Sequence, residues 1–328
     1  MDKVIGNFLI GLKPGVLLVH KNMAVIPLVG EGQGGPRFTT MKRALAEKQI
    51  IVREVSEHGS VPDLLVENLS ALMVLLLDGE ELAGAKQNRI LNTSILVRKG
   101  SRIVVPVSCT EHGRWSYSSK EFMDSDVIMS NDIRKMKMHS VTESLKRDAS
   151  FYSNQGMIWE DIAKMSEKMK VNSKTGAMKQ IFADRKATLD EYVDAFPAIE
   201  GQVGLAVFIN GKMVGLEALA RVEAYADYHE RLVRSYAMDA LDGSGTECAP
   251  PCVEDVSAFI RETRDCDERS FKSRGAGTDW RYEGGAIVGA ALKYGKSVIH
   301  AAFFKLDKRD EGDPGRCRTG SFRYDQGL

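Results

Sequence analysis

Short apolar runs separated by polar turn residues dominate the first third of the chain. They occupy residues 23–29, 50–55, 64–67, 72–77, 90–97 and 103–107. Runs of this length at spacings of about 8–12 residues predict the strands of a sandwich- or jelly-roll-like structure. Asp78-Gly79 predicts a hairpin, because both residues tolerate positive φ. Residues 98–101 predict another tight turn. A short helix, capped by Thr39 or Thr40 and ending near residue 48, interrupts the strands.

The apolar spacing changes to a helical period after residue 130. Helices are predicted over 131–147, 157–170, 175–195, 217–241 and 253–264, and strands over 203–209, 213–216, 285–292 and 297–304. Asn210-Gly211 lies between two strands and predicts the clearest hairpin of the chain. Arg231, Ser235 and Asp239 recur at helical spacing, and we expect their face of the helix to be solvated.

Together these elements predict an α+β fold with one large domain over residues 1–304. A strand-rich part (16–115) packs against a helical part (131–197), and the hairpin and helices of 203–304 join the same sheet system. Residues 305–328 are polar without periodicity, and we expect an extended or poorly ordered tail.

Composition narrows the class of protein. The 328 residues are 43% hydrophobic and 27% charged, as in a soluble globular protein. Forty-five basic residues balance 45 acidic ones, which argues against nucleic acid as a partner. The run 72–77 is far shorter than the roughly 20 residues of a membrane span. Glycines and Pro14 interrupt the apolar N-terminus, so we expect a cytoplasmic protein without a membrane anchor. Whether it forms a homo-oligomer stays open.

The five cysteines, at positions 109, 248, 252, 266 and 317, are odd in number and widely scattered. This usage is typical of reduced thiols rather than of a disulfide framework. A zinc site built on Cys248 and Cys252 would be the alternative, but the spacing lacks two tight cysteine pairs. On a strand, Cys109 and Glu111 would lie on one face and His112 on the other, which argues against one ion that contacts all three. We therefore expect no metal site and no cofactor.

Gly30, Gly32 and Gly35 match the GxGxxG spacing of dinucleotide-binding loops. The helix after such a loop should begin inside the motif, whereas residues 36–38 intervene here, and Pro27 interrupts the preceding strand. We therefore interpret these glycines as a flexible loop.

Two polar clusters at strand ends, 86–89 and 109–115, are the strongest candidates for a site. Arginine presents a planar fork suited to carboxylates and phosphates. If Glu111 pairs with one of Arg89 and Arg114, the other is free for an anion, and Trp115 can stack on a ring. The alternative is a closed Glu–Arg network supported by Gln87 and Asn88, and the sequence leaves both open.

Three strings, GEELAGAKQNRILNTSILV, IVVPVSCTEHGRW and RLVRSYAMDAL, resemble the ARG-and-rhodanese-phosphatase-associated protein domain, a prokaryotic family. The resemblance covers residues 16–304 and leaves out the glycine loop. The matching positions are Glu80, Gln87, Asn88, Arg89, Cys109, Glu111, Arg114, Trp115, Arg234, Ser235 and Tyr236. The family is named for genomic neighbours that include ADP-ribosylglycohydrolases. The resemblance implies a role in a stress or conflict system that handles nucleotides or ADP-ribose.

Three functions remain as hypotheses. The first is a ligand-binding or sensor protein for an anionic small molecule such as a nucleotide or an ADP-ribose derivative. Its predicted ligand-binding residues are Gln87, Asn88, Arg89, Glu111, Arg114, Trp115, Arg234 and Tyr236. The second is a hydrolase or transferase with Glu111 as general acid or base, although a nearby arginine would lower the pKa of that carboxyl. The third is a non-catalytic interaction scaffold.

Overall fold

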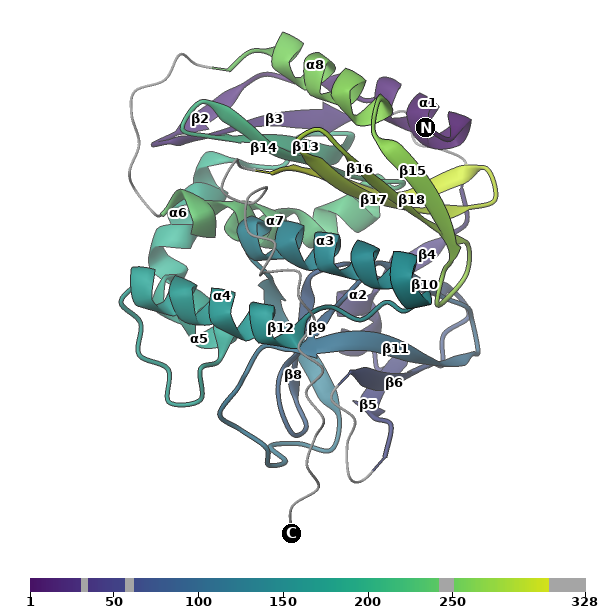
Figure 1. Ribbon diagram of the computed structural model, residues 1–328, viewed down its shortest axis with the longest axis vertical. Coiled ribbons are helices and arrows are strands. Elements are labelled where there is room, and N and C mark those ends of the chain that lie inside the picture. The colour runs from purple at the N-terminus through teal and green to yellow at the C-terminus, as the bar shows by residue number, and fades with distance from the viewer. Residues whose placement is uncertain (31–34, 57–61, 242–250, 307–328) are drawn as a thin grey trace.

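The computed structural model describes residues 1–30, 35–56, 62–241 and 251–306 and shows an α+β fold (Figure 1). Its helices are α1 (Lys3–Ile10), α2 (Met41–Ala46), α3 (Asn131–Asp148), α4 (Gln155–Lys168), α5 (Met178–Asp184), α6 (Lys186–Ala195), α7 (Val222–Ala240) and α8 (Val253–Arg264). Its strands are β1 (Lys13–Pro14), β2 (Leu18–His20), β3 (Met23–Val29), β4 (Phe38–Thr40), β5 (Ile50–Glu54), β6 (Asp63–Asn68), β7 (Met73–Leu76), β8 (Glu80–Gly84), β9 (Arg89–Leu91), β10 (Ile95–Val97), β11 (Arg102–Cys109), β12 (Phe122–Ile128), β13 (Gln202–Ile209), β14 (Lys212–Leu219), β15 (Asp267–Lys272), β16 (Thr278–Gly284), β17 (Ile287–Tyr294) and β18 (Ser297–Lys305).

A nine-stranded antiparallel sheet joins the two ends of the described chain. Its order is β1-β3-β13-β14-β18-β17-β16-β15, and β2 pairs with β3 as well. Helices α1 and α8 cover its outer face, where they share a hydrophobic core with the sheet (Figure 1). Strand β3 pairs with β13, which joins the N-terminal strands and the C-terminal strands in one sheet.

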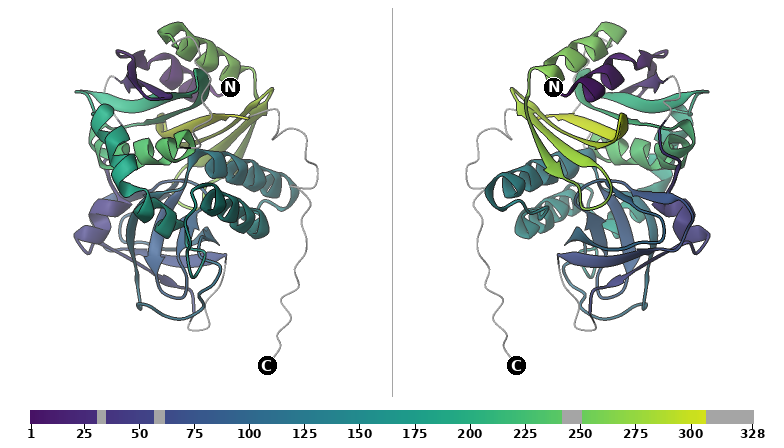
Figure 2. Two further views of the ribbon diagram at one scale, coloured as in Figure 1. Left: turned by 90° about the vertical axis from the view of Figure 1, so that its left-hand side faces the viewer. Right: turned by 90° about the vertical axis from the view of Figure 1, so that its right-hand side faces the viewer.

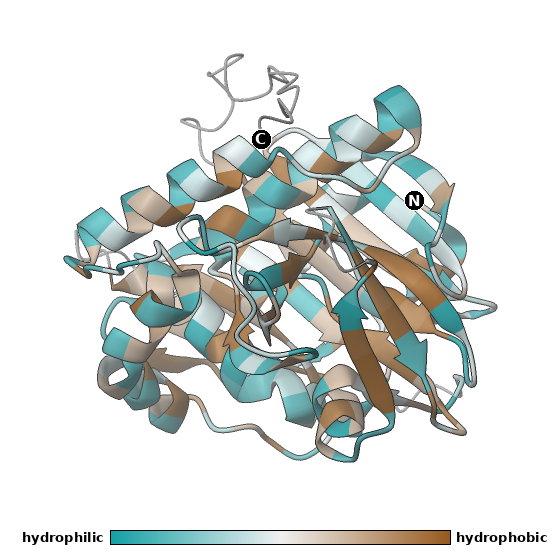
Figure 3. Ribbon diagram, turned by 90° about the horizontal axis from the view of Figure 1, so that it is seen from below, coloured by the Kyte–Doolittle hydropathy of each residue, from teal (hydrophilic) through white to brown (hydrophobic). Residues whose placement is uncertain are grey.

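The other sheets form a second β-rich part, built from residues 38–128. One has the order β12-β8-β9-β11-β6-β5, and the other, β10-β7-β4, contains a parallel pair. Figure 3 shows this part from below, with strands that are hydrophobic along much of their length and helices of mixed character. Between the two β-rich parts lies a helical layer that includes α3 and α7 (Figure 2).

Helix α7 is buried nearly all round because it lies in this middle layer. Tyr225, Tyr228 and Leu232 are at most 1% exposed and belong to the largest hydrophobic core. The expected solvated face was wrong for Arg231 and Ser235, which are 1% and 0% exposed. Helical spacing identifies residues that share a face, but it does not tell what that face contacts.

Local turn and cap signals were confirmed where they act within one hairpin or helix. Asn210 and Gly211 have φ of 51° and 70° between the paired strands β13 and β14. The Thr40 side chain accepts a hydrogen bond from the Arg43 backbone N–H at the start of α2. Most of the expected glycine loop (30–35), loop 242–252 and tail (305–328) lies outside the described residues, which leave out 31–34, 242–250 and 307–328.

Three local expectations were wrong. Asp78-Gly79 makes a turn but no hairpin, since β7 pairs with β10 and β4 whereas β8 pairs with β12 and β9. The run 90–97 is two strands in different sheets, separated by the buried polar residues 92–94. Residues 217–219 extend β14 instead of beginning a helix. In each case pairing with a distant strand decided the local structure.

The structure also contains elements that the apolar pattern missed, among them α1, β15 and β16. Most of β15 is exposed or half-buried at the edge of the large sheet, and its polar sequence gives little periodic signal. Among the described residues no helix has both the length and the apolar character needed to cross a membrane.

Gly275 lies where the turn between β15 and β16 meets β10, and a side chain there should be costly. A Cβ atom would overlap the Leu96 carbonyl oxygen, to which the Ala276 backbone N–H donates at 2.8 Å. Gly275→Ala should lower the free energy of unfolding by about 1–3 kcal/mol, measured by urea denaturation. Gly156→Ala in α4 meets no atom closer than 3.5 Å and serves as the control, with stability unchanged or slightly raised. Equal effects of both changes would contradict the close packing of this turn.

Candidate functional site

Three buried carboxylates surround the turn between β7 and β8. Asp78, Glu80 and Glu81 are only 4%, 0% and 0% exposed. Side chains of adjacent strand residues point to opposite faces, so Glu80 and Glu81 contact different partners. Polar groups from α3, from α7 and from the segment after β11 meet at this turn.

Asp78 binds two cations of α3. Lys137 Nζ forms an ion pair with Asp78 and also donates to the Leu91 carbonyl oxygen at 2.6 Å. Arg134 Nη2 lies 3.7 Å from the other Asp78 oxygen and 2.8 Å from Glu217. Burial lowers the pKa of Lys137 to about 8, although Asp78 opposes the shift. At neutral pH the ammonium thus keeps its charge and anchors α3 to the turn.

Glu217 continues the network toward Ser94 through His300. His300 Nε2 lies 3.8 Å from a Glu217 oxygen, and its Nδ1 lies 2.8 Å from Ser94 Oγ. Burial raises the pKa of Glu217, but Arg134 and His300 outweigh this effect and hold it below its ordinary value. A serine, an imidazole and a carboxylate in this order are the groups of a nucleophilic relay.

The cavity beside Ser94 and His300 is too small for a substrate. It has a volume of about 10 Å³ and is also lined by Asp78, Asp279 and Arg281, which is room for about one water molecule. Arg281 is satisfied by Asp279, at 2.5 Å, and by Thr93. We therefore interpret these residues as a closed polar core that joins the two β-rich parts.

Glu80 and Glu81 have pKa values that are raised to near neutrality. Burial raises the pKa of Glu80 to about 7, while Arg231, at 3.1 Å, and Tyr228, at 3.2 Å, oppose the shift. Burial likewise raises the pKa of Glu81 to about 7, against a hydrogen bond from Thr110 Oγ1 at 2.5 Å.

Arg114 is the centre of a closed network in the loop after β11. Its Nη2 lies 2.6 Å from Glu111, and it also donates to Asn88 Oδ1 and to the carbonyl oxygens of Gly84, Ala85 and Ser116. Of the two arrangements that the sequence left open, this geometry matches the network. Arg114 fastens residues 110–118 to the segment after β8.

Glu111 is poorly suited to be a general acid. Burial raises the pKa of its carboxyl, but hydrogen bonds from Arg114, Thr175 and the Asn88 backbone outweigh burial, so the pKa is lowered overall. The carboxyl thus stays ionised at neutral pH. An acid catalyst must carry a proton near the working pH, whereas the Glu111 carboxyl has already lost its proton there.

Arg89 and Cys109 lie beneath this loop and are fully buried. Arg89 donates to Gln87 Oε1 at 3.0 Å and lies 3.7 Å from Glu54. Gln87 Oε1 also accepts from the Cys109 thiol at 3.1 Å. Burial raises the pKa of Cys109 to about 11, so the sulfur is a neutral thiol and not a nucleophilic thiolate.

Two aromatic rings of the same loop face solvent. Trp115 and Tyr117 are each 50% exposed, and Lys86 Nζ lies 5.2 Å from both ring centroids. The Arg89 guanidinium lies 5.7 Å from the Trp115 ring. We call Lys86, Trp115 and Tyr117 the aromatic–lysine surface. Sequence reasoning missed Tyr117, although its position two residues after Trp115 is a signal for a shared strand-like face.

Arg234 and Tyr236 lie elsewhere, on α7. Arg234 pairs with Asp190 of α6, at 3.0 Å, and with Glu230, at 3.3 Å. Tyr236 is fully buried in the main core. Among the contacts of the described residues, none joins either side chain to the residues 87–89 or to the loop 110–118.

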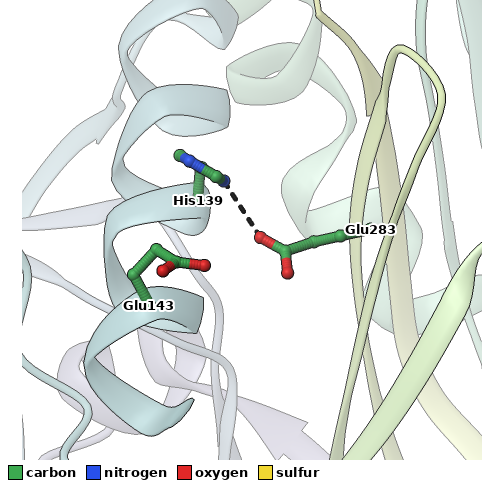
Figure 4. A group of neighbouring side chains, drawn as sticks. All are labelled: His139, Glu143 and Glu283. Carbon is green, nitrogen blue, oxygen red and sulfur yellow. Dashed lines mark hydrogen bonds and ion pairs between the residues drawn. The ribbon is translucent and has the colours of Figure 1, made fainter. Parts of the chain in front are cut away.

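One group of described side chains has the composition of a metal centre. His139 and Glu143 of α3 and Glu283 of β16 point toward one another at the protein surface (Figure 4). They are not among the positions that the sequence singled out, because Glu283 is 144 residues from His139.

Comparison with known proteins gives one match. The model of a family described as the ARG and Rhodanese-Phosphatase-superfamily-associated Protein domain matches residues 11–304. No curated protein matches the chain, and no solved structure does. The match covers both β-rich parts and the helical layer between them.

Removing Arg114 should destabilise the fold because it leaves the Glu111 carboxylate buried without its cation. We expect Arg114→Ala to lower the free energy of unfolding by about 3–5 kcal/mol, or somewhat less because 17% of the Arg114 side chain is exposed. The double change Glu111→Gln/Arg114→Met should recover much of the loss, since both charges leave together. Urea denaturation of all three variants tests this, and a fully stable Arg114→Ala protein would contradict it.

The raised pKa of Glu81 predicts that stability falls as pH rises. Between its ordinary pKa of 4.5 and the folded value of about 7, the folded state holds the proton that the unfolded state has lost. Stability should therefore decrease across this interval, by about 3 kcal/mol for this group, and level off above it. Glu81→Gln should reduce the slope and be more stable than the parent at pH 8. Denaturation midpoints at several pH values, with the exposed Glu121→Gln as control, test the sign; parallel curves would refute it.

Proposed function

The chain belongs to the ARG and Rhodanese-Phosphatase-superfamily-associated Protein domain family, and we propose that it binds or senses an anionic small molecule that carries an aromatic ring. A nucleotide or an ADP-ribose derivative has this chemistry. The observation that carries the proposal is the aromatic–lysine surface, where one ammonium lies 5.2 Å from two half-exposed rings.

The aromatic–lysine surface offers both interactions that such a ligand needs. Stacking of a base on an aromatic side chain contributes about 1–3 kcal/mol and tolerates any base. The Lys86 ammonium provides a positive charge for a phosphate or carboxylate next to the stacked ring. Trp115 supplies the larger ring face, and Tyr117 lies two residues further along the same loop.

The arginines of the two polar clusters have a supporting role in this proposal. Arg114 binds Glu111 and several carbonyl oxygens, and Arg89 lies near Glu54 and Gln87. We propose Lys86 as the cation for the anion because its ammonium lies 5.2 Å from both exposed rings. The Arg114 network contributes by fixing the loop so that its rings need little ordering when the ligand binds.

The biological setting that we propose is a prokaryotic stress or conflict system in the cytoplasm. Its support is associational, because it comes from the family and not from a residue. The chemistry of the aromatic–lysine surface does not depend on this setting and is tested separately.

A ligand panel can separate ring binding from anion binding. We expect ADP-ribose and AMP to quench tryptophan fluorescence and to raise the melting temperature. Adenosine lacks the phosphate and ribose 5-phosphate lacks the aromatic ring, so both should bind more weakly. Trp115→Ala should weaken binding about 5- to 150-fold, the equivalent of one lost stacked base. Lys86→Met should weaken nucleotides but not adenosine, and should reduce the salt dependence of binding.

Two variants away from the aromatic–lysine surface serve as controls. Lys42→Met removes a lysine that pairs with Asp126 at the surface and should leave ligand binding unchanged. Tyr152→Ala removes another exposed aromatic ring, 39% exposed, with the same expectation. Absence of any thermal shift or quenching at millimolar ligand would refute the proposal and favour an interaction scaffold. Turnover of the ligand, lost in Glu111→Gln, would instead favour the hydrolase or transferase.

A further inference from the structure

The side chains of His139, Glu143 and Glu283 converge at the edge of the helical layer. Their candidate ligand atoms all lie within 4.8 Å of one another, and His139 Nδ1 is 3.0 Å from a Glu283 oxygen (Figure 4). His139 and Glu143 are one helical turn apart on α3, which places them on one face of that helix. Glu283 reaches the same point from the end of β16. A helix of the middle layer and a strand of the large sheet thus supply three potential ligands.

The spacing is close to that of a bound ion. Two ligand atoms that each lie about 2.1 Å from one ion are about 3–3.5 Å apart, and the His139–Glu283 pair already has this separation. The site is also reachable, since the side chains of His139 and Glu283 are 30% and 19% exposed. Binding would need only a small movement of Glu143, whose side chain is 44% exposed.

A cation of the protein already lies among these carboxylates. Lys146, one further turn along α3, is 2.8 Å from Glu143 and forms an ion pair with Glu283 as well. The two glutamates therefore face a positive charge at the position where a metal ion would need one. The Lys146 side chain is 29% exposed, and ion pairs that water can reach are weak, so an ion could displace the lysine.

We propose that His139, Glu143 and Glu283 form a binding site for a divalent transition-metal ion, and that the Lys146 ammonium occupies this site when the ion is absent. One imidazole and two carboxylates suit Zn²⁺, Co²⁺ or Mn²⁺ better than Mg²⁺, which prefers oxygen ligands alone. Three protein ligands leave coordination positions open, as in metal sites that bind a further molecule. The proposal does not depend on the aromatic–lysine surface.

Titration of the untagged full-length protein with Co²⁺ and Zn²⁺ tests the site. Calorimetry should give one tight equivalent, and the visible spectrum of Co²⁺ should indicate nitrogen and oxygen ligands without a thiolate band. His139→Ala and Glu283→Gln should each weaken binding at least tenfold, since even residues that only support a ligand change metal affinity by about 10- to 100-fold. Mg²⁺ at the same concentration should not compete.

Lys146→Met distinguishes a metal site from a purely structural ion-pair cluster. It removes the competing ammonium and leaves all three ligands, so Co²⁺ should bind about tenfold more tightly. Glu160→Gln, in the exposed Lys164 pair of α4, is the control and should bind as the parent does. The proposal is overturned if neither the parent nor Lys146→Met binds Co²⁺, if His139→Ala binds as the parent does, or if a thiolate band identifies cysteines as the ligands.

Discussion

The burial of three carboxylates at the turn between β7 and β8 is the constraint on which the rest of the structure depends. An isolated buried charge costs several kcal/mol, so each carboxylate requires a partner or a proton. Asp78 obtains Lys137 from α3, Glu80 obtains Arg231 from α7, and Glu81 is hydrogen-bonded by Thr110 after β11. The helical layer and the lower sheets are therefore fixed to each other by polar groups as well as by the hydrophobic core.

The same principle explains how the loop after β11 is held in place. Arg114 contacts Glu111 and the Ser116 carbonyl oxygen within the loop, and the Ala85 carbonyl oxygen after β8. These contacts hold the loop against the segment that follows β8. The rings of Trp115 and Tyr117 in the same loop remain half-exposed. Glu111 and Arg114 were predicted from the sequence to bind a ligand, but their contacts stabilise the loop. The proposed ligand contacts are those of Lys86 and the two exposed rings.

The two proposed sites differ in how they relate to the fold. The aromatic–lysine surface is built from the loop after β11 and from Lys86 after β8, so all of it lies within residues 86–117. The cluster of His139, Glu143 and Glu283 exists only because β16 ends beside α3. A ligand at the first site would act on a loop, whereas an ion at the second would fasten the large sheet to the helical layer.

The sequence by itself determined the features that depend on neighbouring residues. The Asn210-Gly211 hairpin, the helix α3 and the α+β class follow from turn chemistry and from apolar spacing. It also identified the polar clusters around residues 87–89 and 109–115. Only the tertiary structure decided that Arg114 is enclosed by protein acceptors and that His300 lies beside Ser94, 206 residues away. Local periodicity carries no information on such pairings, because their energy comes from contacts between strands and helices far apart in the chain.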